Sequence, residues 1–538
     1  MFQSRKSGIL LHLSSIPSPF GIGDFGGNAY RFIDKLVSAK QTLWQILPLC
    51  PVDGSGSPYQ STSAFAGEPL FIGLDLLVEE GLLLEREVEQ AGEAPFARTD
   101  YAAARRIKLP LLQKAFRKFN ENIIPSDYYD FLEKNNYWLE DYALFMAIKA
   151  HFIEIRRENQ EGLSEFLEQA KDFLSEEKGV AYFFAACWCS FPTDLRGRKP
   201  EALLAWAEAL KSEIEWEYFL QYLFHKEWHA LKSYANENEI QIIGDTPIFV
   251  SYDSADVWAN QKAFQLNSLG FPTVVAGVPP DYFCEKGQLW GNPLYQWKYH
   301  EKTGYAWWIC RIRKALEDVD ILRIDHFRGF ESYWEVPFHG EDARCGQWAK
   351  GPGRKLFRKL EKELGELPVI AEDLGMITQE VHKLREKTGF PGMRVLHFAF
   401  GDDTNHPYLP HSYDKNTVVY TGTHDNNTTI GWYENATEKE KDHFRRYMNV
   451  TGEAPNWSLI RLAFSSPAEM AIIPLQDVLG LGEDYRMNMP GTVGGNWSFA
   501  FQWDMWNEGS IEGLKYLSTL FGRNEDERKI GQHPTICD

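Results

Sequence analysis

One unit recurs eight times along this sequence and limits the folds open to it. A short apolar run rich in β-branched residues ends in a polar residue, and a loop and a helical pattern follow. Strands that alternate with helices pair in parallel, and eight such units are the number that closes a (β/α)8 barrel. We therefore predict an α/β fold of the TIM barrel type. The eight runs are residues 8–13, 42–49, 240–244, 321–324, 369–371, 393–400, 417–421 and 471–475.

The chain is longer than this barrel requires. A minimal barrel takes roughly 250 residues, so about half of the 538 residues must lie in insertions, which extend the loops at the carboxyl ends of the strands. We expect a single catalytic barrel over residues 1–538. Its main insertion, about 51–239, has mostly helical patterns with acidic, solvated faces. A second insertion, about 251–320, contributes a substrate loop with a lid over 278–295.

The charge balance excludes two classes of partner. The formal net charge is −20, which repels phosphate backbones and anionic lipid headgroups, and no basic stripe reverses it locally. We therefore expect neither nucleic acid nor membrane as a partner. A neutral ligand is unaffected by this field, and 18 Trp, 24 Tyr and 35 Phe offer many flat apolar faces for one.

The cysteines and the amino terminus favour a reducing compartment. Seven scattered cysteines form no CxxC pair and indicate neither a disulfide framework nor a zinc knuckle. The apolar stretch at 8–13 is too short for a signal peptide, and no run approaches the roughly 20 residues that cross a bilayer. We expect a cytoplasmic protein.

Metal and nucleotide motifs are weak. The 14 histidines show no metal-ligand spacing, and no Walker A, HExxH or G-x-S-x-G sequence occurs. Residues 21–26 match G-x-G-x-x-G, but a proline-containing segment separates them from their strand, and no acidic residue ends the next strand. We therefore expect no metal and no cofactor.

Four of the apolar runs end in carboxylates: Asp245, Asp325, Glu372 with Asp373, and Asp425. Because the active sites of such barrels lie at the carboxyl ends of the strands, these acids should meet at one mouth. A single Asp at a strand end is most simply the cap of the next helix. Four like charges brought together destabilise a fold unless function uses them, and we therefore interpret them as an active site.

Alternation along the fourth run places Arg323 and Asp325 on one side of the strand. The guanidinium would keep Asp325 ionised, as a nucleophile requires, whereas Glu372 follows apolar residues and is the candidate proton donor. Alternation does not decide whether Glu372 or Asp373 enters the site. Asp425 could bond ligand hydroxyls and stabilise positive charge. A nucleophilic and an acidic carboxyl group roughly 5–5.5 Å apart make up the apparatus of a retaining glycosidase.

Two loops have the composition of a carbohydrate site. Sugars stack their C–H faces on aromatic rings and bond their hydroxyls to neighbouring polar groups. The alternative, that these rings only pack the barrel rim, stays open for each of them. The residues in question are Ser57 and Tyr59 after the second run, and Asp281, Tyr282, Trp290 and Asn292 in the lid.

The chain also carries eight short segments that together are highly specific. They are Ser-Pro-Tyr-Gln-Ser at 57–61, Gly-Asp-Thr-Pro-Ile-Phe-Val at 244–250, Val-Pro-Pro-Asp-Tyr-Phe at 278–283, Trp-Gly-Asn-Pro-Leu-Tyr at 290–295, Arg-Ile-Asp-His-Phe-Arg-Gly at 323–329, Ala-Glu-Asp-Leu-Gly at 371–375, Thr-His-Asp-Asn at 423–426 and Arg-Met-Asn at 486–488. Through these segments the sequence resembles the amylomaltases, which are 4-α-glucanotransferases (disproportionating enzymes) related to the α-amylases.

The resemblance implies a barrel that acts on α-1,4-glucans as donor and acceptor. It implies Asp325 as the nucleophile, Glu372 as the acid and base, and Asp425 as the stabiliser of the transition state. We therefore expect retaining transfer of a glucan segment to the 4-hydroxyl of another glucan or of glucose, through a covalent glucosyl-enzyme. Further positions that match family contacts with substrate are Asp245, Arg323, His326 and His424 around the donor sugar, and Trp290 and Asn496 elsewhere.

Three other functions stay open at this point. An α-glucan hydrolase would use the same residues. A magnesium-dependent lyase of the enolase type also places carboxylates at the strand ends of a barrel, with a Lys or His as base; no lysine stands at such an end, although His424 could serve. A glucan-binding scaffold without catalysis would keep the groove alone, and the complete set of acids argues against it.

Overall fold

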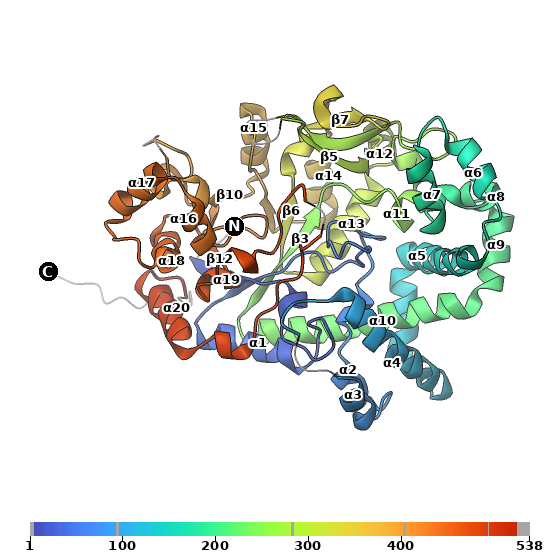
Figure 1. Ribbon diagram of the computed structural model, residues 1–538, viewed down its shortest axis with the longest axis horizontal. Coiled ribbons are helices and arrows are strands. Elements are labelled where there is room, and N and C mark those ends of the chain that lie inside the picture. The colour runs from blue at the N-terminus through green and yellow to red at the C-terminus, as the bar shows by residue number, and fades with distance from the viewer. Residues whose placement is uncertain (1–4, 93–95, 281–284, 402–404, 493, 525–538) are drawn as a thin grey trace.

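The computed structural model describes residues 5–92, 96–280, 285–401, 405–492 and 494–524. Parallel strands close into a barrel in the order β1-β12-β11-β10-β9-β6-β3-β2 (Figure 1). Each strand overlaps one of the eight apolar runs, so the predicted (β/α)8 barrel is confirmed. The strands are β1 (Lys6–Leu10), β2 (Leu43–Gln45), β3 (Gln241–Pro247), β6 (Ile321–Asp325), β9 (Val369–Ala371), β10 (Gly392–Val395), β11 (Thr417–Tyr420) and β12 (Met470–Pro474).

The barrel strands are short and buried on both faces. Every residue of β9, β11 and β12 is buried, which explains their continuous apolar composition. Some runs extend past their strands: in the run 393–400, β10 ends at Val395 and a short 3-10 helix begins at Leu396. The apolar runs therefore predict where the strands lie, but not how long each strand is.

Helices in the barrel units cover the outside of the closed sheet. In α14, the buried residues Leu356, Phe357 and Leu360 recur at helical spacing, so one apolar stripe packs inward and the charged residues face solvent. These helices are α1 (Gly27–Ser38), α10 (Lys211–Glu237), α13 (Ala306–Asp318), α14 (Arg354–Leu364), α15 (Gln379–Thr388), α16 (Thr429–Asn435), α17 (Glu438–Met448), α18 (Pro455–Ser465), α19 (Leu475–Val478) and α20 (Glu508–Leu520).

The chain between β2 and β3 is largely helical, and its distal part lies on the right in Figure 1. The long helix α5 packs along α10 and buries Trp138, Tyr142 and Phe145. Among the described residues, no helix combines the length and the apolar character that crossing a membrane would need. The helices before α10 are α2 (Leu74–Glu79), α3 (Glu85–Ala91), α4 (Tyr101–Glu121), α5 (Ser126–Glu158), α6 (Leu163–Ala170), α7 (Glu176–Phe184), α8 (Thr193–Arg196) and α9 (Pro200–Ala209).

A second, antiparallel sheet of order β5-β4-β7-β8 is absent from the sequence-based expectation. Two of its strands precede β6 and two follow it, so that Val275 lies opposite Val336. Part of the expected lid over 278–295 is therefore a strand of this sheet. The elements of this region are α11 (Ala255–Ala259), β4 (Val274–Val278), β5 (Gln288–Pro293), α12 (Trp297–Lys302), β7 (Ser332–Pro337) and β8 (Gln347–Lys350).

Candidate active site

The strand order brings the predicted acids to one edge of the barrel. β3, β6 and β9 are neighbours in the closed sheet. Asp245 lies opposite Arg323 in register, and Ile324 lies opposite Ala371. Asp325 and Glu372, each one residue further along, therefore leave adjacent parallel strands at the same level.

Arg323 lies between two of these acids. Its Nη1 donates to Asp245 Oδ2, and its Nη2 donates to Asp325 Oδ1 at 2.8 Å. The side chains of Arg323 and Asp245 are buried, whereas that of Asp325 is 29% exposed. Burial raises the pKa of Asp245, although the Arg323 charge acts in the opposite direction. Of the two acids, only Asp325 stays open to an incoming ligand.

Glu372 has a different environment. Its two carboxyl oxygens accept hydrogen bonds from the backbone N–H groups of His326 and Leu374, each at 2.8 Å. Burial and the charge of Asp325 raise the pKa of Glu372 from 4.5 to about 8, against the lowering effect of Arg323 and the two backbone donors. The group therefore carries a proton at neutral pH, which suits a general acid.

The backbone at His326 is arranged to hold Glu372. Its φ is 53°, in the left-handed region that residues other than glycine rarely adopt. Two successive N–H groups point at one residue as a result: that of His326 reaches the Glu372 carboxyl, and that of Phe327 reaches the Glu372 carbonyl oxygen at 3.2 Å. Local strain of this kind persists where the surrounding contacts enforce it, and here it ties the predicted acid to the strand of the predicted nucleophile.

The structure separates Glu372 from its neighbour Asp373. The buried Asp373 carboxylate accepts a hydrogen bond from the backbone N–H of Met393 at 2.7 Å. Arg385 Nε and Arg394 Nη1 lie 3.2 and 3.6 Å from its oxygens. Asp373 therefore joins β9 to β10 and α15, and Glu372 is the member of the pair that faces the other acids.

Asp425 lies in the loop after β11. Its Oδ1 accepts a hydrogen bond from Asn488 Nδ2, and its carbonyl oxygen accepts one from Arg486 Nη2, both at 2.6 Å. Its side chain is 42% exposed. Arg486 and Asn488 were assigned no role from the sequence. The available signal was the segment Arg-Met-Asn at 486–488, which is among those that carry the family resemblance.

Tyr59 connects the ends of two strands. Its hydroxyl donates to Asp245 Oδ2 at 2.7 Å and lies 2.9 Å from His424 Nε2. The rings of Tyr59 and His424 are stacked, with their centroids 5.3 Å apart. The Ser57 hydroxyl accepts a hydrogen bond from the backbone N–H of Tyr59 at 3.3 Å and so shapes the loop that carries the ring.

Trp290 reaches His326 from the second sheet. The two rings meet edge to face, with their centroids 4.8 Å apart. Burial lowers the pKa of His326 to about 4, although Asp325 acts in the opposite direction, so the imidazole is neutral. Asn292, two residues further along β5, is buried and donates from Nδ2 to the carbonyl oxygen of Val250 at 3.0 Å, which is a structural contact.

Asn496 orders its own loop. Its Oδ1 accepts a hydrogen bond from the backbone N–H of Met489 at 2.9 Å, and its Nδ2 donates to Thr492 Oγ1 at 3.1 Å. Two further predicted residues, Asp281 and Tyr282, lie outside the described residues.

The charges at this edge disfavour the lyase alternative. A magnesium ion takes several carboxylate oxygens at once. Here the positive charge of Arg323 lies between Asp245 and Asp325 and would repel a divalent cation bound to both. The arrangement instead offers a carboxylate bonded to a cation, a carboxyl group of raised pKa on the adjacent strand and a third carboxylate in the loop after β11.

The chain is similar to known proteins over nearly its whole length. A sequence model of the family described as 4-alpha-glucanotransferase matches residues 11–504. The 4-alpha-glucanotransferases of Synechocystis sp. and Thermus thermophilus are each 46% identical, over 530 and 507 residues, which is 97% and 92% of this chain and 99% and 94% of those proteins. The solved structure of the Streptococcus agalactiae amylomaltase in complex with acarbose matches with a TM-score of 0.87 at 39% identity, over 97% of this chain and 100% of that one.

Proposed function

The chain belongs to the 4-alpha-glucanotransferase family and transfers glucan segments between α-1,4-glucans, and on that premise we propose which residues perform the transfer. Asp325 is the nucleophile, Glu372 is the general acid and base, and Asp425 stabilises the positive charge of the transition state. One observation supports this assignment above all: on adjacent strands, Asp325 is paired with Arg323 while the pKa of Glu372 is raised to about 8.

The reaction takes two steps. Asp325 attacks the anomeric carbon of the donor while Glu372 gives its proton to the leaving glycosidic oxygen, and a covalent glucosyl-enzyme forms. Glu372, now ionised, then takes the proton from the 4-hydroxyl of an acceptor glucan, whose oxygen attacks the same carbon and releases Asp325. Two inversions at one carbon retain the α-configuration.

Transfer prevails over hydrolysis only if the acceptor is held in position better than water is. Near-attack positioning reaches effective molarities of about 10⁵ M or more. We assign the acceptor side to Trp290 and the lid over 278–295, and the donor side to Tyr59, Asp245 and His424. Trp290 presents an aromatic face beside His326, and the Tyr59 hydroxyl joins the other two side chains.

Maltotriose distinguishes the candidate functions. A ladder of longer and shorter glucans in chromatography reports transfer, whereas glucose and maltose alone report hydrolysis. Asp325→Asn should lower the rate of disproportionation by roughly 10³-fold or more, because removing one member of a catalytic unit abolishes most of the rate enhancement that the whole unit provides. Asp504→Asn, at an exposed acid, is the matched control and should keep the wild-type ladder. Near wild-type turnover in Asp325→Asn removes the nucleophile assignment.

An activated donor separates the roles of Asp325 and Glu372. Fluoride leaves an α-maltosyl fluoride without needing a proton, so glycosylation of the enzyme no longer requires the general acid. Glu372→Gln should therefore release a first equivalent of fluoride per chain from this donor far faster than it cleaves maltotriose, and then slow down because the second step still needs Glu372 as base. Asp325→Asn should be equally impaired toward both donors. The opposite pattern would exchange the two roles.

We also propose that the protein works in the cytoplasm. The described cysteines Cys50, Cys187, Cys189, Cys310 and Cys345 are free thiols. Free thiols persist in reducing compartments, where disulfides are rare. Fractionation of cells followed by an assay for transfer checks the location, and activity confined to the extracellular fraction contradicts it.

A further inference from the structure

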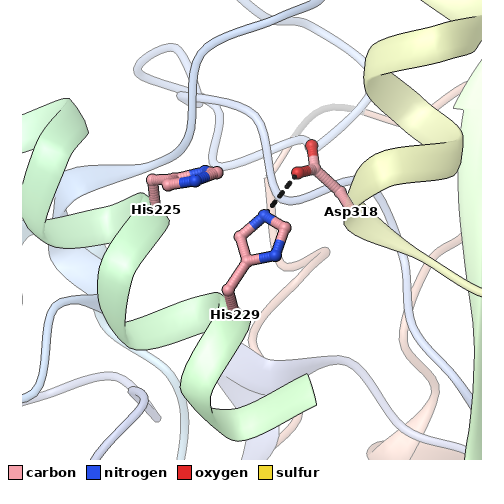
Figure 2. Close-up of side chains that lie close together, drawn as sticks. All are labelled: His225, His229 and Asp318. Atoms are coloured by element: carbon pink, nitrogen blue, oxygen red, sulfur yellow. Dashed lines mark hydrogen bonds and ion pairs between the residues drawn. The ribbon is translucent and has the colours of Figure 1, made fainter. Parts of the chain in front are cut away.

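Two histidines and an aspartate meet on the outer layer of the barrel. His225 and His229 lie one turn apart on α10, and Asp318 is the last residue of α13. Figure 2 shows both rings and the carboxylate directed at one gap between the two helices. Asp318 precedes β6, whose other end carries Asp325. The cluster is therefore separate from the predicted catalytic acids.

The distances within the cluster suit a small cation. One ligand atom from each of the three residues can be chosen so that all lie within 4.8 Å of one another. His229 Nε2 is 3.3 Å from Asp318 Oδ1. That is long for a hydrogen bond to a carboxylate, but two ligands of a tetrahedral zinc ion, each about 2.0–2.1 Å from the metal, are also about 3.3 Å apart. The rings of His225 and His229 have their centroids 4.1 Å apart.

His225 has no other evident polar task. Its ring packs on that of Phe131 at a centroid distance of 5.2 Å. Among the described residues, no hydrogen bond reaches either of its ring nitrogens. The ring is half-buried and lies at the gap between α10 and α13. A neutral imidazole is the form that binds metals.

Asp318 supplies a charged oxygen. Lys314 Nζ bonds to both oxygens, at 2.5 Å to Oδ1. A metal would take Oδ1 while Lys314 keeps Oδ2, and this competition makes the affinity lower than that of a site without the lysine.

We propose that His225, His229 and Asp318 form a Zn²⁺ site with a water molecule as the fourth ligand. Two imidazoles and one carboxylate suit zinc and other transition metals such as iron, copper and nickel, whereas magnesium and calcium prefer sites made of oxygen alone. The sequence did not predict this site. His225 and His229 are four residues apart on one helix, but their third partner lies far away in the sequence.

The role of this site is structural. α10 leads into β3 and α13 leads into β6, and these two strands are neighbours in the barrel. A metal bridging the helices would hold together the two units that present Asp245 and Asp325. Zinc should therefore raise thermal stability, because it binds the folded state and not the unfolded one, and leave the turnover of maltotriose unchanged.

The test uses the full chain, stripped of metal and without a polyhistidine tag. Titration with Zn²⁺ against a chromogenic chelator should show one saturable equivalent per chain. His225→Gln and His229→Gln should each weaken binding at least roughly tenfold, and the double variant should lose that equivalent. His151→Gln, at a half-buried histidine of α5, is the matched control and should bind as the wild type does.

Two further measurements show whether the loss of binding has another cause, such as misfolding of the double variant. The double variant should turn over maltotriose at the wild-type rate, which shows that it is folded, and its melting temperature should no longer rise with Zn²⁺. Co²⁺ bound to the wild type should give the visible absorption of a four-coordinate ion. Absence of a saturable equivalent, or binding that is unchanged in the double variant, overturns the proposal whether or not Asp325 and Glu372 have the roles assigned to them.

Discussion

Replacing Glu372 with Gln should remove a pH-dependent loss of stability. The pKa of Glu372 is raised from 4.5 to about 8 in the folded protein, because of burial and the charge of Asp325. Between these two values the folded state binds more protons than the unfolded state, so the free energy of unfolding falls as pH rises. Gln does not titrate. The variant should therefore gain stability relative to the wild type as pH rises through this window.

The size of the gain follows from the shift. Each pKa unit corresponds to about 1.4 kcal/mol, and integrating the linkage for a group moved from 4.5 to about 8 gives a relative gain of about 2.5 kcal/mol between about pH 5 and about pH 7. The substitution also lowers the free energy of unfolding by an amount that does not depend on pH. The Gln side chain has one acceptor oxygen in place of two, so the N–H of His326 or Leu374 loses its partner, at a cost of about 1–3 kcal/mol. The prediction therefore concerns how the difference in the free energy of unfolding changes with pH, and not its value at any one pH.

Urea unfolding of the wild type and of Glu372→Gln across about pH 5 to 8 measures this slope. Glu361→Gln, at an exposed residue of α14, is the matched control and should follow the wild type. In an Asp325→Asn background the slope should shrink, because that neighbouring charge is one cause of the raised pKa. A difference between Glu372→Gln and the wild type that stays constant with pH, or a variant that loses stability relative to the wild type as pH rises, refutes the reasoning.

Three other substitutions test the surroundings of the site. Tyr59→Phe removes a donor to buried Asp245, and kcat/KM for maltotriose should fall roughly tenfold, the equivalent of one buried hydrogen bond; an unchanged value would leave the hydroxyl without a role. Asn488→Ala frees the Asp425 carboxylate, and steady-state kinetics should show a larger effect on kcat than on KM if Asp425 acts in the transition state. Asp373→Ala should lower the free energy of unfolding by about 3–5 kcal/mol, since it leaves two arginines without their buried partner, and kcat per folded molecule should stay the same; a collapse of kcat at unchanged stability would make Asp373 the acid.

The barrel could be predicted because its strands carry their signal locally. Parallel strands buried on both faces consist of unbroken apolar residues, as β9 and β12 do. The second sheet has no such signal. Its strand β8 is mostly exposed, β7 has buried and half-buried residues, and β7 pairs with β4 from before β6. Only the closed barrel brings these segments together, so the sequence pattern of either one does not predict the pairing.

The acids of the site were predictable for the same reason, since each follows an apolar run: Asp245 and Asp325 lie near the ends of β3 and β6, and Glu372 and Asp425 come after β9 and β11. The residues that hold them were not. Asn488 meets Asp425 only because the loops after β11 and β12 converge. The choice between Glu372 and Asp373 depends on Arg385 and Arg394, which lie in later elements and hold Asp373 away from the mouth. Alternation along a strand sets two directions but does not say which of them faces the barrel axis.

The strand order explains why Glu372, and not another acid, holds the proton. β6 lies between β3 and β9, and a guanidinium presents its nitrogens in one plane. Nη1 of Arg323 bonds to Asp245 on β3, Nη2 bonds to Asp325 on its own strand, and Nε faces the sulfur of Met393. Glu372, on the other side, receives only neutral backbone donors. One cation among three ionised acids would leave two negative charges unbalanced, and burial makes such charges costly. A proton on Glu372, which the guanidinium does not bond, lowers that excess by one, in line with its raised pKa.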